Sequence, residues 1–152
     1  MINGNGGGNG NGGGSGNGGT YGSTSGTETR EARAMIEPLM HFSLVEEIAA
    51  LRAEAEYRTR DRNSRTLAKE TDFRVLLSVL RSGAALDEQD GHARASVQVI
   101  EGTAQLSIDG DETVLHAGEL AVMDSGNAWL LQAQNDCAVL LTLAWPREKA
   151  GI

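Results

Sequence analysis

The sequence predicts an all-β domain of the sandwich or barrel type, preceded by one or two short helices and a disordered N-terminal tail. Two observations lead to this fold class. From Thr66 to Ala144 the chain alternates short apolar stretches with turn residues, and none of these stretches has helical periodicity. Short strands at regular spacing with turn residues between them are typical of sandwiches and barrels.

Eight short strands are expected in this region. The stretch Phe73–Leu80 is almost continuously apolar, which predicts a strand buried on both faces. Asp109-Gly110-Asp111 is a hairpin turn signal, and Asp87, Glu88 and Asp90 suggest an acidic loop. The other expected strands are Thr66–Lys69, Ala95–Glu101, Ala104–Ile108, Glu112–His116, Leu120–Met123, Ala128–Ala133 and Cys137–Ala144.

The chain divides into three segments by composition. Residues 1–26 hold 13 of the 20 glycines and no charged side chain, so they bury too little apolar surface to fold and are expected to be disordered. Residues 27–64 are expected to be helical. Residues 65–147 are expected to form the β domain.

Two helices are expected ahead of the strands. Thr27–Ile36 reads as a short polar helix that ends before Pro38. Ser43 opens a clearer helix that runs to Tyr57, because a hydroxyl followed three residues later by Glu46 forms a capping pattern. One face of this helix is apolar, and Glu54 and Arg58 have the spacing of a helical ion pair. The apolar face consists of Leu44, Ile48, Leu51 and Ala55.

Four arginines lie within eight residues at the end of this helix, at positions 58, 60, 62 and 65. Two interpretations are open. They are either a solvated loop or an edge strand guarded by charge, or the rim of a site that binds carboxylate or phosphate.

Charge and composition exclude several classes of function. The formal net charge is −8, and residues 73–152 carry eleven acids against five bases, which argues against nucleic-acid binding by the β domain. No stretch has the about 18–20 apolar residues of a membrane span, and the N-terminus lacks a signal-peptide pattern. Cys137 is the one cysteine and lies in an apolar run, so we expect a buried thiol and no disulfide. The expected location is the cytoplasm.

Glycines recur at fixed offsets among the apolar stretches of this region. One series, the first motif, runs from Gly83 through Gln89, Gly91 and Ala95 to Gly102. The second motif begins at Gly118, and its later positions are Asp124, Ser125, Gly126, Trp129 and Ala133. The spacing of these two motifs resembles that of the cupin superfamily, and the resemblance covers residues 65–146. The resemblance implies a jelly-roll barrel, and small cupins of this kind commonly form dimers through sheet edges, so a homodimer is expected.

The resemblance does not extend to the metal ligands. In metal-binding cupins, two His and one Glu of the first motif and one His of the second hold the ion. The matching residues here are Gln89, Gly91, Ala95 and Trp129. None of these is a competent ligand of a divalent transition metal. We therefore expect no metal site and no cofactor.

A candidate ligand pocket can be placed at the inward positions of the motif strands. Alternation from Ala95 and from Trp129 turns every second side chain inward, and Gln89 or His92 is expected to supply a hydrogen bond. Two interpretations are open: Trp129 either fills the barrel or forms one wall of a small apolar pocket. The pocket residues would be Gln89, His92, Val97, Val99, Trp129 and Leu131.

The function expected from the sequence is a metal-free cupin-like domain that binds a small ligand or serves as a sensor or assembly module. No nucleophile–base pair is evident, so no catalytic residue is assigned. The alternative is a small cupin enzyme, an isomerase or a metal-dependent dioxygenase, with displaced ligands. That alternative requires His92 and His116 to meet in space with a carboxylate.

Overall fold

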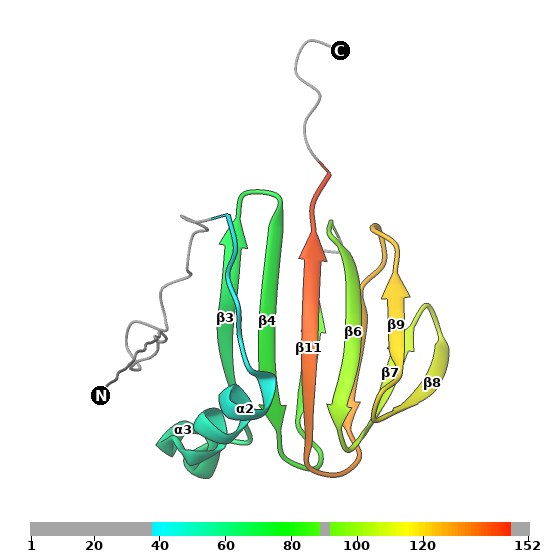
Figure 1. Cartoon of the computed structure of the whole chain (residues 1–152). Helices are drawn as coiled ribbons and strands as arrows, with labels where there is room; N and C mark the ends of the chain where they lie inside the picture. The colour runs from blue at the N-terminus through cyan, green and yellow to red at the C-terminus, as the bar shows by residue number, and fades with distance from the viewer. Residues whose placement is uncertain (1–37, 89–91, 147–152) are drawn as a thin grey trace, which may run out of the picture.

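The computed structural model describes residues 38–88 and 92–146. Two short helices, α2 and α3, precede the strands β3 to β11 (Figure 1). The expected N-terminal tail and the expected helix Thr27–Ile36 lie outside the described residues. The helices are α2 (Leu44–Ala53) and α3 (Ala55–Thr59). The strands are β3 (Arg62–Glu70), β4 (Phe73–Leu80), β5 (Ala85–Glu88), β6 (Arg94–Glu101), β7 (Thr103–Ile108), β8 (Asp111–His116), β9 (Leu120–Met123), β10 (Trp129–Ala133) and β11 (Cys137–Ala144).

The strands form two antiparallel sheets that face each other, as Figure 1 shows. One sheet has the order β3-β4-β11-β6-β9 and the other has the order β5-β10-β7-β8. Apart from the hairpins β3–β4 and β7–β8, each strand lies in the opposite sheet from the strand before it. This alternation is the jelly-roll arrangement, so the predicted fold class is confirmed.

All eight expected strands are present, with two differences. β3 begins at Arg62 rather than at Thr66, so two of the four clustered arginines belong to an edge strand. β5 was not expected, because Asp87 and Glu88 suggested an acidic loop, and for these two residues that prediction was wrong. β5 pairs with β10, and Leu86 lies opposite the buried Leu131 and packs against the main core.

The main core lies between the two sheets and is built by alternation along the strands. In β10 the side chains of Trp129, Leu131 and Ala133 are buried while those between them are exposed. β6 and β11 face them with a matching set of inward residues. Cys137 is completely buried in this core, and burial raises the pKa of its thiol to about 11. The expectation of a buried thiol is confirmed.

A second core lies on the outer face of the five-stranded sheet, beneath α2. Ile48 and Leu51 of this helix pack against Leu77 and Val79 of β4. The helix begins as expected, with the Ser43 hydroxyl accepting a hydrogen bond from the Glu46 backbone N–H at 3.4 Å. β4 contributes alternate residues to both cores. The prediction of a strand buried on both faces is therefore confirmed for residues 77–80, whereas Phe73 is exposed and residues 74–76 are half-buried.

The expected helix does not continue to Tyr57, because it breaks at Glu54. There the backbone is extended, and the Glu54 carboxylate accepts hydrogen bonds from Asn63 at 2.9 Å and from Arg65 at 2.9 Å. The expected pair between Glu54 and Arg58 is therefore wrong, and Arg58 instead donates to the Ala53 carbonyl. Contacts with β3 outweigh a local ion pair that is worth only about 0.3–0.5 kcal/mol.

Arg65 joins both ends of α2 to the sheet. Its side chain is 9% exposed and binds Glu47 at 2.7 Å and Glu54 at 2.9 Å. Of the four arginines, Arg62 and Arg65 lie on the edge strand and point to opposite faces of the sheet. Arg65 binds Glu47 of α2 on the outer face, and Arg62 binds the Ala85 carbonyl on the inner face. They form no shared rim for an anion, which fits the first of the two interpretations.

The Arg65 ion pairs predict a measurable loss of stability. We expect Arg65→Gln to lower the free energy of unfolding by about 2–4 kcal/mol, between the values for exposed and for broken buried pairs. The matched control is Arg94→Gln, because Arg94 pairs with Asp124 at the surface. The control should cost less than about 1 kcal/mol. Urea unfolding measures both, and equal losses would contradict this role of Arg65.

The motif glycines shape the turns of the barrel. Gly83, Gly102, Gly118 and Gly126 all have φ between +85° and +96°, a region that other residues rarely adopt. Gly102 has a second constraint, since a Cβ there would lie 2.7 Å from Cβ of Cys137 and against the Asp136 carbonyl. The glycine spacing recognised in the sequence is therefore a requirement of the backbone.

Two alanine substitutions separate these constraints. Gly118→Ala meets only the backbone penalty of positive φ, because nothing lies within 4 Å of the added Cβ, and should cost about 1–2 kcal/mol. Gly102→Ala adds a steric clash and should cost about 3–5 kcal/mol. Thermal unfolding of both variants measures the difference. Similar melting temperatures for the two would show that the chain relaxes around position 102.

Candidate functional site

The motif strands bring four of the six predicted pocket residues into one core. Trp129 and Leu131 on β10 face Val97 and Val99 on β6, and all four belong to the same buried cluster. Gln89 lies outside the described residues. His92 is exposed at the surface and takes part in an interaction of its own.

The depth of these residues differs. Val97, Val99 and Leu131 have no exposed surface, so neighbouring side chains enclose them completely. Trp129 is the first residue of β10 and lies opposite Ile108 of β7, at one end of the barrel. A ligand that enters from this end would meet Trp129 before the deeper residues. That Val97, Val99 and Leu131 contact a ligand stays a prediction.

Trp129 has an unusual polar atom. Its side chain is 4% exposed, and its Nε1 is buried without a hydrogen-bond partner in the part of the chain that the structure describes. A buried indole N–H usually finds a partner, because leaving one unpaired costs about 1–3 kcal/mol. This end of the barrel therefore presents a hydrogen-bond donor that no described residue uses, in apolar surroundings.

An ion pair borders the same end of the barrel. Arg94 donates to Asp124 at 2.7 Å, and these residues flank Ala95 and Met123, which are paired between β6 and β9. The backbone N–H of Ser125 and then Arg94 lower the pKa of the Asp124 carboxyl. Both partners are well exposed, so they mark the rim and not the interior.

The remaining motif positions place no metal ligand in the interior. Ala95 is buried and offers no donor atom, and Gly91 lies outside the described residues. His116 lies at the end of β8, the outer edge of its sheet, and its backbone N–H donates to Glu119. Within residues 38–88 and 92–146, no group of three His, Cys, Asp or Glu side chains is arranged to hold a metal ion.

Sequence reasoning missed Arg74. β4 was expected to be an apolar strand, yet Arg74 lies on its inner face, opposite the buried Leu143. Its guanidinium lies over the Trp145 ring, 5.1 Å from the centroid, and its Nε is buried without a hydrogen-bond partner among the described residues. The sequence contained a signal for this position. Arg74, Leu76 and Leu80 are at alternate positions and so share a face of the strand, and Leu76 and Leu80 contribute to the main core.

Two facing antiparallel sheets, the jelly-roll strand order and the positive-φ glycines define the cupin fold, and comparison with solved structures confirms it. The chain has this fold. A scan against protein-family models and a search of curated proteins find no match.

Solved structures with this fold have diverse roles. A conserved protein of unknown function from Streptococcus pyogenes, SPY1581, is 24% identical with a TM-score of 0.60, covering 74% of this chain and 93% of that one. The Cupin_2 domain of an XRE family transcriptional regulator from Enterobacter cloacae is 18% identical with a TM-score of 0.52, covering 58% of this chain and 100% of that one.

A third similar structure is an enzyme. A mutant of salicylate 1,2-dioxygenase from Pseudoaminobacter salicylatoxidans is 18% identical with a TM-score of 0.58, covering 68% of this chain and 34% of that one. Identities this low establish the fold alone. Among the described residues, no helix is both long enough and apolar enough to cross a membrane.

Proposed function

We propose that residues 65–147 form a metal-free cupin-like domain that binds a small, largely apolar ligand at the Trp129 end of the barrel. The observation that carries the proposal is the buried Trp129 N–H, which lacks a partner among the described residues. The ligand would supply an acceptor for this N–H and an apolar surface for the indole ring. Binding of this kind stabilises the folded domain by mass action, so a ligand can be detected by the rise in melting temperature that it causes.

The residues at the metal positions support a site of this kind. Trp129 occupies the position of the second-motif His, and Ala95 occupies that of the Glu. An indole ring fills space that an ion and its waters take in a metal-binding cupin. Gln89 and His92 remain the predicted sources of a further hydrogen bond.

Replacing Trp129 by Phe tests the proposal, because Phe keeps an aromatic wall but removes the N–H. We expect members of a panel of small aromatic and aliphatic acids, amides and alcohols to raise the melting temperature of the wild-type domain. Trp129→Phe should weaken their binding about 5- to 100-fold, the value of one buried hydrogen bond. Tyr57→Phe, which also keeps a ring and removes one polar group but lies in the core beneath α2, is the control and should bind within about 2-fold of the wild type.

Two results would overturn the proposal. One is a panel in which no compound binds. The other is purified protein that carries one equivalent of Fe, Mn, Ni or Zn and loses an activity on chelation. The second result would favour the alternative, a small isomerase or metal-dependent dioxygenase with displaced ligands. That alternative has only the fold-level likeness to a dioxygenase in its favour.

Self-assembly is a second proposed property, and β9 favours it. β9 is an edge strand with β6 as its one neighbour in the sheet, and its outward side chains Leu120 and Val122 are 57% and 72% exposed. An edge strand with unpaired backbone groups and exposed apolar side chains is suited to pairing with another strand. We propose that the partner is a second copy of this chain.

A charge on β9 tests the homodimer. We expect wild-type protein at micromolar concentration to have twice the monomer mass by light scattering. Val122→Lys should shift it to the monomer, because lysines near each other across a symmetric strand pairing repel and a charged edge strand disfavours pairing. Val114→Lys on β8, at another exposed valine, is the matched control and should remain a dimer. A wild-type monomer would contradict the proposal.

A further inference from the structure

The inner face of the five-stranded sheet changes character along its width. On β11 and β6 the inward residues are apolar, whereas on β3 and β4 most of them are polar. Residues directly opposite each other in an antiparallel pair share a face, so the register identifies this set. We call it the β3–β4 inner surface, and it consists of Arg62, Ser64, Thr66, Lys69, Arg74 and Ser78.

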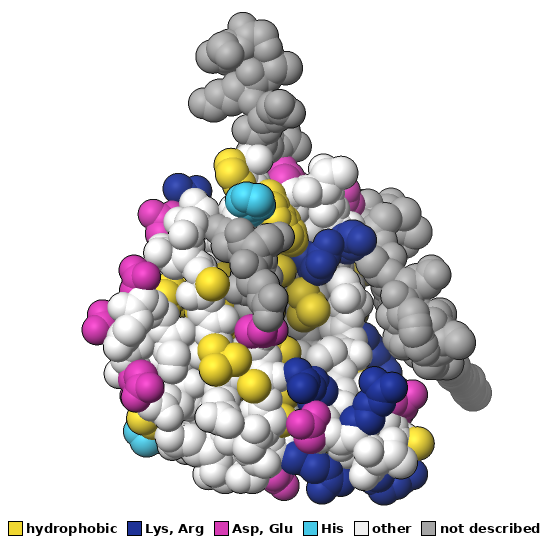
Figure 2. Space-filling view, turned by 180° about the vertical axis from the view of Figure 1, so that it is seen from behind, with side chains coloured by type: hydrophobic (Ala, Val, Ile, Leu, Met, Phe, Trp, Pro, Cys, Tyr) yellow, Lys and Arg dark blue, Asp and Glu magenta, His cyan; other side chains and the backbone are white. Residues whose placement is uncertain are grey.

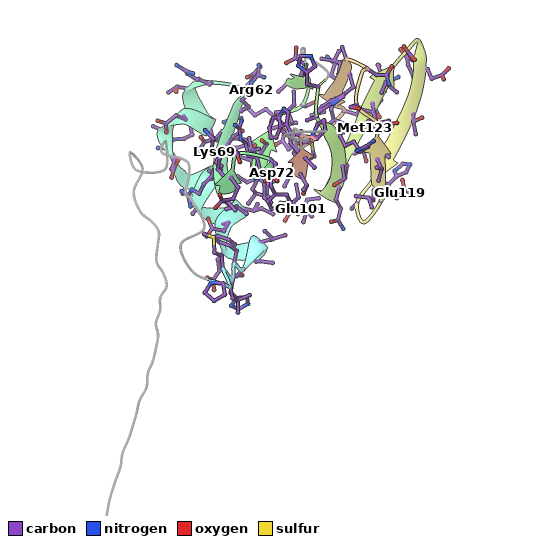
Figure 3. All side chains as sticks on the ribbon, turned by 90° about the horizontal axis from the view of Figure 1, so that it is seen from above. Arg62, Lys69, Asp72, Glu101, Glu119 and Met123 are labelled. Atoms are coloured by element: carbon purple, nitrogen blue, oxygen red, sulfur yellow. The ribbon has the colours of Figure 1, made fainter. Side chains whose placement is uncertain are left out.

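The arrangement of the sheets explains why polar side chains are tolerated there. The four-stranded sheet ends at β5, so β3 lies at the open side of the jelly roll. At this side Arg62 donates to the Ala85 carbonyl of β5 and so links the two sheets. Figure 3 shows Arg62 and Glu101 on opposite sides of the five-stranded sheet, with Arg62 on the side that faces the four-stranded sheet. The β3–β4 inner surface is therefore the wall of the barrel beside this opening.

Positive charge gathers on this side of the molecule although the chain is acidic. Figure 2 shows Lys and Arg side chains on the β3 side of the rear face, beside a band of hydrophobic side chains. Acidic side chains lie mainly along the β8 side of the same face. An anion that approaches the barrel is attracted to the β3 side by this asymmetry.

Arg74 is the residue of the β3–β4 inner surface whose position best suits ligand binding. The Trp145 ring lies beneath its guanidinium, and Trp145 is held there by a backbone hydrogen bond from its N–H to the Asp72 carbonyl at 3.0 Å. Its Nε is buried but unpaired within the described residues. Arg65 differs, although its Nε is unpaired too, because its two terminal nitrogens already bind carboxylates.

Arg74 and Trp129 lie at the same end of the barrel. Arg74 is opposite Leu143, Leu143 is opposite Ala95, and Ala95 is opposite Met123, so these residues form one row across the inner face. Leu143, Ala95 and Met123 belong to the cluster that contains Trp129. Two N–H donors without partners among the described residues, one cationic and one neutral, thus border the same apolar end.

The geometry points to a small organic acid as the ligand, with its carboxylate on Arg74 and Lys69 and its apolar part against Trp129. This inference rests on the proposed ligand-binding function and adds the class of ligand. A guanidinium that is partly removed from water binds a carboxylate more strongly than an exposed one, and its planar fork matches two carboxylate oxygens. The hydroxyl of Thr66 lies on the same wall and adds a donor.

Matched acids and amides test the inference. Benzoate and hexanoate should bind the wild-type protein at least about 10-fold more tightly than benzamide and hexanamide, as one charge-assisted interaction predicts. Arg74→Met should remove most of the preference for the acids and leave amide binding unchanged. Arg94→Gln, which removes an exposed cation at the same end, should leave acid binding within about 2-fold. Calorimetry and tryptophan fluorescence measure the affinities.

Melting temperatures without ligand distinguish a binding role of Arg74 from a structural one. A ligand-binding arginine is kept at a cost to stability, so Arg74→Met should melt at the wild-type temperature or a few degrees higher. A variant that fails to fold, or that melts more than about 8 °C lower, would assign Arg74 a structural role and overturn the inference. Lys69→Gln should fold normally and weaken acid binding about 3- to 10-fold, and unchanged binding would also count against it.

Other outcomes separate this inference from the proposed function. Equal binding of acids and amides, weakened for both by Trp129→Phe, would overturn the carboxylate assignment and leave the ligand site standing. Binding of inorganic phosphate as tight as that of benzoate would show an anion site without an apolar subsite, which also contradicts the inference. If no compound in the panel binds, the proposed function and the inference fall together.

Discussion

Burial of the central strand pair on both faces constrains most of this fold. β4 and β11 pair along their whole length, and alternate residues enter either the main core or the core beneath α2. The outer core needs a cover, which α2 provides, and the ion pairs of Arg65 hold that cover in place. A slip of one residue would exchange the two faces, so this pairing fixes the register of the sheet.

Arg74 is informative because it brings a charge to the end of this strand pair. It lies on the inner face at the half-buried start of β4, opposite the buried Leu143. Its Nε is buried without a hydrogen-bond partner among the described residues, which is unfavourable, and the Trp145 ring compensates only in part. The Trp129 N–H at the same end, unpaired within the described chain, is a second local cost. Unfavourable free-energy contributions of this kind tend to occur at the sites where proteins bind their ligands.

The glycines and the metal ligands of the cupin motifs serve separate physical needs. Positive φ at Gly102 and Gly118 is required by the turns, and at Gly102 the contact with Cys137 adds a steric limit. These requirements persist whatever the barrel binds. The ligand positions carry no such requirement, so Ala95 and Trp129 fit the same backbone. The fold therefore identifies the barrel without identifying its chemistry.

Local sequence was sufficient to predict the strand pattern, the turns and the inward direction of Val97 and Trp129, because alternation and glycine conformation are local properties. It did not predict β5, which pairs with the distant strand β10, nor the helix break at Glu54, which depends on contacts with β3. The position of Arg74 at the Trp129 end of the barrel emerged from the folded arrangement. The residues that surround the unpaired N–H groups of Arg74 and Trp129 come from strands that are distant in the sequence. Whether a polar atom is buried is decided only when the two sheets assemble.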